Sequence, residues 1–120
     1  MPVFNLAEYR RKPHAELQPS LPVVSFNRTE LGIIMSLYGR MVAAGIWRDY
    51  GISHLRDIAV FSIFRRTADF PLYRIEKNPD QKSKNSLYLV KAMDGQILKR
   101  GNELKRVIEV LDKRNLKLVG

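Results

Sequence analysis

The sequence predicts an α+β fold in which an N-terminal helix, a four- to five-stranded antiparallel meander sheet and a C-terminal helix follow one another. Three observations predict it. Apolar residues recur with helical spacing over residues 28–44, short alternating runs follow over residues 47–100, and helical spacing returns after Gly101. A chain of 120 residues with 45% apolar residues has the size and composition of one globular domain, so the helices and the sheet are expected to share one hydrophobic core.

The two ends of the chain are expected to lie outside this core. Residues 1–22 contain four of the six prolines and no sustained pattern, which predicts a flexible arm, because proline removes a backbone donor and restricts its predecessor. Residues 115–120 are expected to form a frayed or extended tail. The single α+β domain is therefore predicted over residues 23–114.

The first helix, over residues 28–44, has clear start signals. Asn27 is a favourable N-cap, and Glu30 is placed to complete a capping box by accepting a hydrogen bond from the Asn27 N–H. Phe26 and Leu31 have the spacing of a hydrophobic staple. The apolar stripe of this helix is predicted to consist of Leu31, Ile34, Met35, Tyr38, Met41 and Val42.

Strand patterns fill the middle of the chain, after a glycine at position 45 that is expected to end the helix. Strands are expected over residues 47–53, 58–64, 71–77, 86–92 and 96–100. The second run is apolar at both alternating sets of positions, which predicts a central strand covered on both faces. Residues 80–85 are polar and are expected to form a loop, and Asp94-Gly95 predicts a two-residue hairpin turn.

A second amphipathic helix is expected after the sheet. Asn102 is placed to cap it, and the helix is predicted to reach residue 114. Its buried stripe is predicted to consist of Leu104, Val107, Ile108 and Leu111.

The positive charge is concentrated in the last third of the chain. The formal net charge is +9, and residues 81–120 contain ten Lys and Arg against four Asp and Glu, a surplus of +6. The later strands and the final helix are therefore expected to form the chief cationic surface. Such a surface suits RNA, another phosphate-bearing ligand or an acidic protein partner, although it can also serve solubility alone.

The candidate residues for binding an anion or a partner are basic. Arginine presents a planar fork that matches phosphate and carboxylate oxygens. The alternative is that the arginines form ion pairs with Asp49, Asp69 and Glu76 around the edges of the sheet. The candidates are Arg40, Arg48, Arg65, Arg66, Arg74, Lys91, Lys99, Arg100, Lys105 and Arg106.

The sequence contains no recognisable motif for enzymatic or cofactor chemistry. The chain has no cysteine, which excludes disulfides, thiolate nucleophiles and cysteine-ligated metals, and His14 and His54 lack the spacing of a metal site. Glycine-rich phosphate loops and catalytic triads are also missing. We therefore expect no catalytic, cofactor or metal residues. No apolar run is long enough for a membrane helix or a signal peptide, so a cytoplasmic protein is expected.

Three functional interpretations stay open. The first is a non-enzymatic basic module that contacts nucleic acid or a ribonucleoprotein surface, with Tyr73 and Tyr88 available for base stacking unless they belong to the core. The second is a protein-interaction or adaptor domain, including a homodimer joined through a sheet edge or through the amphipathic helices. The third is a small protein or enzyme that holds an anionic metabolite with its arginines.

Several collinear segments resemble a family of small uncharacterised proteins from alphaproteobacteria that is known only as a domain of unknown function. The segments are FNRTEL (26–31), LYGRMVAAG (37–45), WRDYGI (47–52), AVFSIFRR (59–66), PLYRIEKNP (71–79) and ILKRG (97–101). The resemblance covers about residues 26–111. It implies a bacterial cytoplasmic setting and supplies no activity and no site residues.

Overall fold

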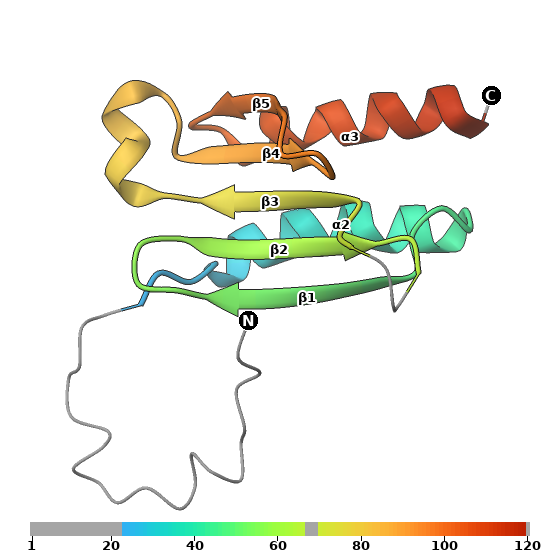
Figure 1. Ribbon diagram of the computed structural model, residues 1–120, viewed down its shortest axis with the longest axis horizontal. Helices are drawn as coiled ribbons and strands as arrows, with labels where there is room; N and C mark the ends of the chain where they lie inside the picture. Colours follow the sequence, from blue (N-terminus) through green and yellow to red (C-terminus); the bar gives the residue numbers. More distant parts are fainter. Residues whose placement is uncertain (1–22, 67–69, 120) are drawn as a thin grey trace, which may run out of the picture.

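A computed structural model describes residues 23–66 and 70–119 of the chain (Figure 1). The expected arm over residues 1–22 and the acidic residue Asp69 lie outside the described residues. The elements are α2 (Arg28–Ala43), β1 (Asp49–His54), β2 (Ala59–Phe64), β3 (Tyr73–Lys77), the short 3₁₀ helix η2 (Pro79–Lys84), β4 (Tyr88–Ala92), β5 (Ile97–Gly101) and α3 (Leu104–Val119). The predicted α+β order of helix, sheet and helix is confirmed.

The sheet is an antiparallel meander in which sequence order equals spatial order, β1-β2-β3-β4-β5. Figure 1 shows α2 and α3 behind the sheet, on the same face. A β-bulge between Val90 and Lys91 interrupts the pairing of β4 with β5. The hairpin predicted at Asp94-Gly95 is confirmed, but its loop has three residues, Met93 to Gly95, and not two. Gly95 has a positive φ (+89°) and Asp94 does not, whereas a two-residue type I′ turn needs both.

One hydrophobic core joins the two helices to the face of the sheet that they cover. Within the strands the buried positions alternate, because successive side chains point to opposite faces. The core consists mainly of Ile34, Leu37 and Met41 from α2, Phe61, Ile63, Tyr73, Ile75, Tyr88 and Val90 from the strands, and Leu104, Val107, Ile108 and Leu111 from α3. All four residues predicted for the buried stripe of the second helix are in it.

The prediction that residues 58–64 form a central strand covered on both faces is wrong in part. β2 is an interior strand, but the described helices cover only one of its faces. Val60 points to the other face and is nevertheless only 9% exposed. Its burial therefore does not come from α2 or α3.

The capping box predicted for α2 is confirmed. The Asn27 side chain accepts from the Glu30 N–H (2.8 Å), and Glu30 Oε1 accepts from the Asn27 N–H (2.7 Å). Phe26 is buried and Leu31 is packed against the core, as expected for a staple. The helix ends at Ala43, and Gly45 follows at φ +76°, where a side chain would be strained.

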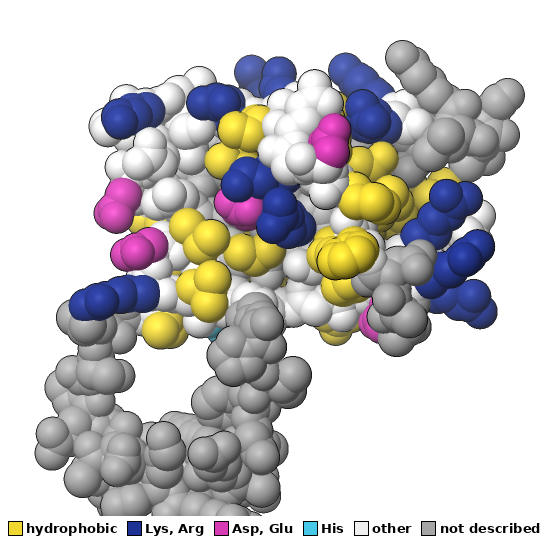
Figure 2. All heavy atoms as spheres, in the orientation of Figure 1, with side chains coloured by type: hydrophobic (Ala, Val, Ile, Leu, Met, Phe, Trp, Pro, Cys, Tyr) yellow, Lys and Arg dark blue, Asp and Glu magenta, His cyan; other side chains and the backbone are white. Residues whose placement is uncertain are grey.

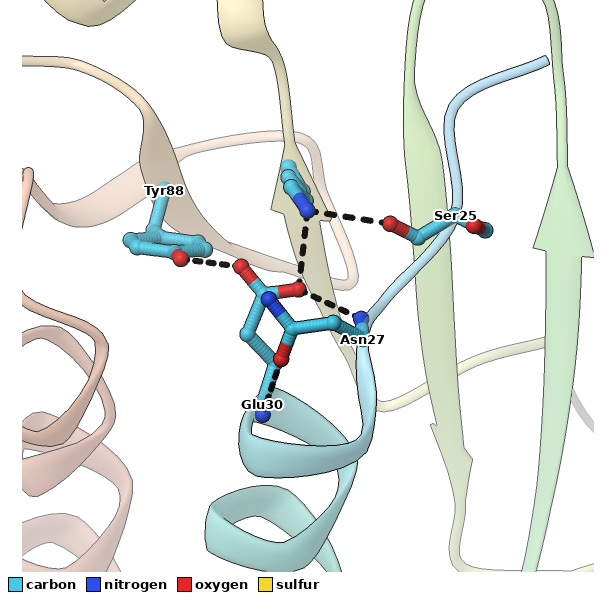
Figure 3. Close-up of polar contacts among 5 residues, drawn as sticks. Ser25, Asn27, Glu30 and Tyr88 are labelled. Carbon is cyan, nitrogen blue, oxygen red and sulfur yellow. Dashed lines mark hydrogen bonds and ion pairs between the residues drawn. The ribbon is translucent and has the colours of Figure 1, made fainter.

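Glu30 also links α2 to two strands (Figure 3). Lys77 Nζ of β3 lies 2.8 Å from Glu30 Oε1 and also donates to the Ser25 carbonyl at 3.0 Å. The hydroxyl of Tyr88 in β4 donates to Glu30 Oε2. Burial raises the pKa of Glu30, but hydrogen bonds from Lys77, Tyr88 and Asn27 outweigh it, so this pKa lies below its ordinary value of 4.5. The pKa of Tyr88 is raised, first by burial and then by the Glu30 carboxylate.

Two local predictions are wrong, one between β3 and β4 and one between β5 and α3. The expected loop over residues 80–85 is largely η2, which begins after Asn78 because the Asn78 side chain accepts from the Asp80 N–H (3.2 Å) and Pro79 favours a first helical turn. Asn102 does not cap α3. Its Oδ1 accepts from the Leu87 N–H (3.1 Å), and its Nδ2 donates to the Lys82 carbonyl (2.9 Å). Asn102 therefore holds the loop that contains η2 against the end of β5.

α3 is longer than expected and continues to Val119. The residues assigned to a tail contain no helix-breaking Pro or Gly before Gly120, so the helical pattern has no reason to stop at residue 114. In the part of the chain that the structure describes, neither α2 nor α3 combines the length and the hydropathy that crossing a membrane requires.

Candidate nucleic-acid interface

The sheet face opposite α2 and α3, which we call the open face, has no described helix over it (Figure 1). The strand register places two rows of side chains on this face. The rows are Gly51, Ser62, Arg74, Lys91 and Ile97, and Ser53, Val60, Glu76, Leu89 and Arg100. Three of the ten predicted binding residues, Arg74, Lys91 and Arg100, therefore share one surface.

The centre of the open face carries a net positive charge. Lys91 Nζ lies 3.3 Å from Glu76 Oε2, and Glu76 is only 7% exposed. Arg74 is directly opposite Lys91 in the register. Among the described residues Arg74 forms no hydrogen bond or ion pair that the structure records. Within these two rows of described residues, the Glu76 carboxylate thus lies among three cations, Arg74, Lys91 and Arg100.

The expected ion pairing of the arginines is therefore wrong for Glu76. Glu76 binds Lys91 from the neighbouring strand and not Arg74, which is two residues away on its own strand. Leu89 is directly opposite Glu76, so Lys91 reaches Glu76 along the diagonal between the two strands, which a long side chain can span. Among the described carboxylates, Glu76 therefore pairs with Lys91 and none has a recorded ion pair with Arg74.

Apolar side chains accompany these charges. Leu89 and Phe64 are half-buried on the open face, and Ile97 is 38% exposed. Figure 2 shows hydrophobic side chains around a central basic and acidic group, with further basic side chains at the rim. These apolar residues were not among the predicted binding residues, although their alternation with core residues along each strand is the signal that places them here.

A second group of predicted residues meets at the end of the sheet. After α2 the chain turns back at Gly45, and the N–H groups of Ile46 and Trp47 both donate to the Met41 carbonyl (2.9 and 3.3 Å). The Arg48 N–H then donates to the Phe64 carbonyl (2.9 Å). This connection brings the start of β1 beside the end of β2.

The result is a hollow, which we call the arginine hollow. It has a volume of about 520 Å³ and is open to solvent. Its lining consists of Val42, Gly45, Ile46, Trp47, Arg48, Arg65 and Arg66. The three arginines are exposed, and among the described residues none of them has a recorded ion pair. Since Arg65 and Arg66 directly follow Phe64 in the chain, the hollow adjoins the open face.

The remaining predicted residues do not converge on these surfaces. Arg40 and Lys105 line a groove of about 290 Å³ between α2 and α3, together with Glu109 and Asp112. Arg40 Nη2 is 3.3 Å from Asp112 Oδ2, so charges of both signs meet there. Arg106 Nε is 3.0 Å from Glu103 Oε2 on the exposed side of α3. Lys99 is opposite the core residue Val90 and belongs to the helix side of β5.

The later strands and the final helix were expected to form one chief cationic surface. The structure instead distributes their cations over two sides of the molecule. Strand alternation sends Lys91 and Arg100 to the open face, whereas α3 carries Lys105 and Arg106 on the helix side. The best-grouped cations include Arg48, Arg65 and Arg66, which precede residue 81. Tyr73 and Tyr88 are 4% and 7% exposed in the core, so they cannot stack on bases.

No group of three potential metal ligands occurs within the described residues. A search of curated proteins and a search of solved structures found no match to this chain. The model of one family, described as a protein of unknown function (DUF2794), matches residues 24–108. This match covers most of the 120 residues, and the chain therefore belongs to the DUF2794 family.

Proposed function

We propose that this protein is a non-enzymatic module that binds single-stranded nucleic acid across the open face of its sheet. The observation that carries the proposal is the group of cations on the open face: Arg74 and Lys91 are opposite each other on adjacent strands, Arg100 is on the next strand, and Glu76 is the described carboxylate that pairs with one of them. A bacterial cytoplasmic setting, where RNA is abundant, is part of the proposal.

The chemistry of the open face suits a polynucleotide. Phosphate contacts from Arg and Lys supply most of the affinity for a nucleic acid without regard to sequence. Apolar side chains beside such cations give bases a surface to contact when they are not paired. Leu89 and Phe64 are in this position.

The arginine hollow extends this surface. Arg48, Arg65 and Arg66 would take phosphates of a strand that leaves the open face at the end of β2. The hollow is broad and open, which fits a polymer that enters and leaves better than an enclosed metabolite. Competition with a free nucleotide distinguishes a polymer from a metabolite as the ligand of the hollow, because the mononucleotide alone would saturate a metabolite site.

The proposal is tested by titrating the protein into fluorescently labelled single-stranded RNA at several salt concentrations. If the three open-face cations and the three hollow arginines each neutralise one phosphate, log K falls with log salt at a slope of about −4 on single strands. Arg74→Gln is expected to reduce the slope by about 0.7.

The matched control is Arg106→Gln, which removes an exposed arginine on α3, away from both surfaces. It is expected to leave the slope unchanged. Salt-independent binding, no binding at low salt, or equal effects of the two substitutions would contradict the proposal. An acidic protein that competes for Arg74 in place of RNA would identify the alternative adaptor function.

A further inference from the structure

The outer edge of β1 has no described strand beside it, because β1 is the first strand in the order of the sheet. The Leu55 N–H donates to the Ile58 carbonyl (2.9 Å) and therefore faces β2, whereas the Leu55 carbonyl accepts from the Val24 N–H (2.8 Å). In an antiparallel pair these inward groups alternate with outward ones. The backbone groups of Tyr50, Ile52 and His54 therefore point away from the sheet.

One of these outward groups confirms the alternation. The Tyr50 N–H donates to the side chain of Asp49 (2.8 Å) and not to β2. Asp49 thus shields the first outward N–H of the edge. The outward groups of Ile52 and His54 have no recorded hydrogen bond to a described residue.

The two edges of the sheet differ in their protection. Exposed edges are usually blunted by Lys, Pro or a bulge, because they would otherwise pair with another strand. β5 carries Lys99 and Arg100 and lies next to the bulge at Val90/Lys91. β1, with the sequence DYGISH, has no Lys, Arg or Pro. Of the two edge strands that the structure describes, β1 is therefore the one without these protective features along its length.

An apolar surface, which we call the β1 strip, runs beside this edge. It consists of Met35, Tyr38 and Val42 on α2 and Tyr50 and Ile52 on β1. The rings of Tyr38 and Tyr50 are 5.0 Å apart, which shows that this side of α2 lies over β1. Four of the five side chains are large apolar groups exposed by 36–41%. Neighbouring exposed apolar groups of this kind mark interaction surfaces.

We propose that β1 is the strand through which two copies of this chain join, antiparallel, into one continuous sheet. A two-fold axis perpendicular to the sheet keeps both pairs of helices on the same side. If Ile52 lies opposite its own copy, Tyr50 lies opposite His54 of the second copy. This register uses all three outward-facing residues twice and brings the two β1 strips together.

The charge distribution favours a second copy over a foreign basic or acidic strand. None of the side chains of the β1 strip is charged. Arg74, Lys91 and Arg100 lie on the third, fourth and fifth strands, toward the opposite edge. Two chains with a net charge of +9 can therefore approach through β1 without placing these cations against each other.

The first test is the molar mass of the full chain in solution over a range of concentrations. We expect a species of twice the chain mass of 13.9 kDa. Ile52→Lys places two like charges opposite each other at the two-fold axis and is expected to give a monomer with an unchanged circular dichroism spectrum. Ile97→Lys is the matched control, because Ile97 is an equally exposed strand isoleucine (38% against 39%) at the other edge, and it should remain a dimer.

The second test does not depend on a destabilising charge. Because the chain has no cysteine, Ile52→Cys can form a disulfide only between two copies. Opposite residues in such a pair have Cα atoms about 5.5 Å apart, within disulfide range. Oxidation is expected to cross-link Ile52→Cys and not Ile97→Cys. A monomer at every concentration, a dimer that survives Ile52→Lys, or equal cross-linking of both cysteine variants would overturn the proposal.

Discussion

The hydroxyl of Tyr88 donates a hydrogen bond to the carboxylate of Glu30, so a residue that caps a helix is also bonded to the fourth strand of the sheet. Lys77 bonds the other oxygen of the same carboxylate. A capping interaction is local, but these two contacts span 58 and 47 residues of sequence. The stability of α2 and its position on the sheet therefore depend on one ionised side chain.

Replacing Glu30 by Gln is expected to make the stability of the protein less dependent on acidic pH. Since the pKa of Glu30 is lowered on folding, the ionised carboxylate stabilises the fold above its ordinary pKa of 4.5, and this stabilisation is lost as pH falls through the lower folded value. At pH 7 the substitution should cost about 2 kcal/mol, because hydrogen bonds to a charged group are lost. Denaturant unfolding from pH 7 to pH 3 should show this difference shrinking. Glu103→Gln, at an exposed ion pair, should show no comparable effect.

Removing the Tyr88 hydroxyl is expected to cost about 2 kcal/mol, since it donates to a buried carboxylate. Tyr73→Phe is the matched control, because Tyr73 is a similarly buried strand tyrosine whose hydroxyl, among the described residues, accepts one long bond from Arg114 (3.4 Å). In a double-mutant cycle the effects of Tyr88→Phe and Glu30→Gln should be less than additive. Full additivity would show that the two groups do not stabilise each other.

Asn102→Ala is expected to loosen the loop that contains η2 without unfolding α3. The substitution removes the acceptor of the Leu87 N–H and the donor to the Lys82 carbonyl. Both bonds are exposed, so the loss should be about 1 kcal/mol. Hydrogen exchange of the Leu87 amide should become faster, while the amides of α3 keep their protection. A collapse of protection in α3 would instead assign Asn102 the capping role.

Salt should separate the two proposed interactions. Raising the concentration of NaCl from 50 to 200 mM is expected to weaken RNA binding about 250-fold if the slope is about −4. The dimer formed through β1 rests on backbone and apolar contacts, so its dissociation constant should change little. Sedimentation and RNA titration on the same samples provide the measurement. A dimer that dissociates in step with the RNA would show that nucleic acid bridges the two copies.

Local sequence patterns were sufficient to predict most of the elements. The capping box of Asn27 and Glu30, the turn at Asp94-Gly95 and the buried stripe of α3 depend on residues within a few positions of one another. For the same reason the alternating strands indicated the meander. The start of η2 was not predicted, because the polar composition of residues 80–85 is typical of a loop. The Asn78-Pro79 pair before them is nevertheless a helix start signal.

The site could be predicted only as a set of residue types. Arg48 and Arg65 meet because the turn after α2 carries the chain back to the end of β2, a relationship that no spacing in the sequence contains. The contacts of Lys77 and Tyr88 with Glu30, and of Asn102 with Lys82, likewise join separate segments. The count of charges along the sequence also predicted the wrong cationic surface, because such a count treats residues on both faces of a strand as one surface.

Trp47 is the single tryptophan of the chain, and it lines the arginine hollow. It is 3% exposed, and its indole N–H has no hydrogen-bond partner among the described residues. The protein thus carries a built-in optical reporter whose emission originates beside the three arginines. Anion occupancy there can be followed by intrinsic fluorescence without attaching a dye.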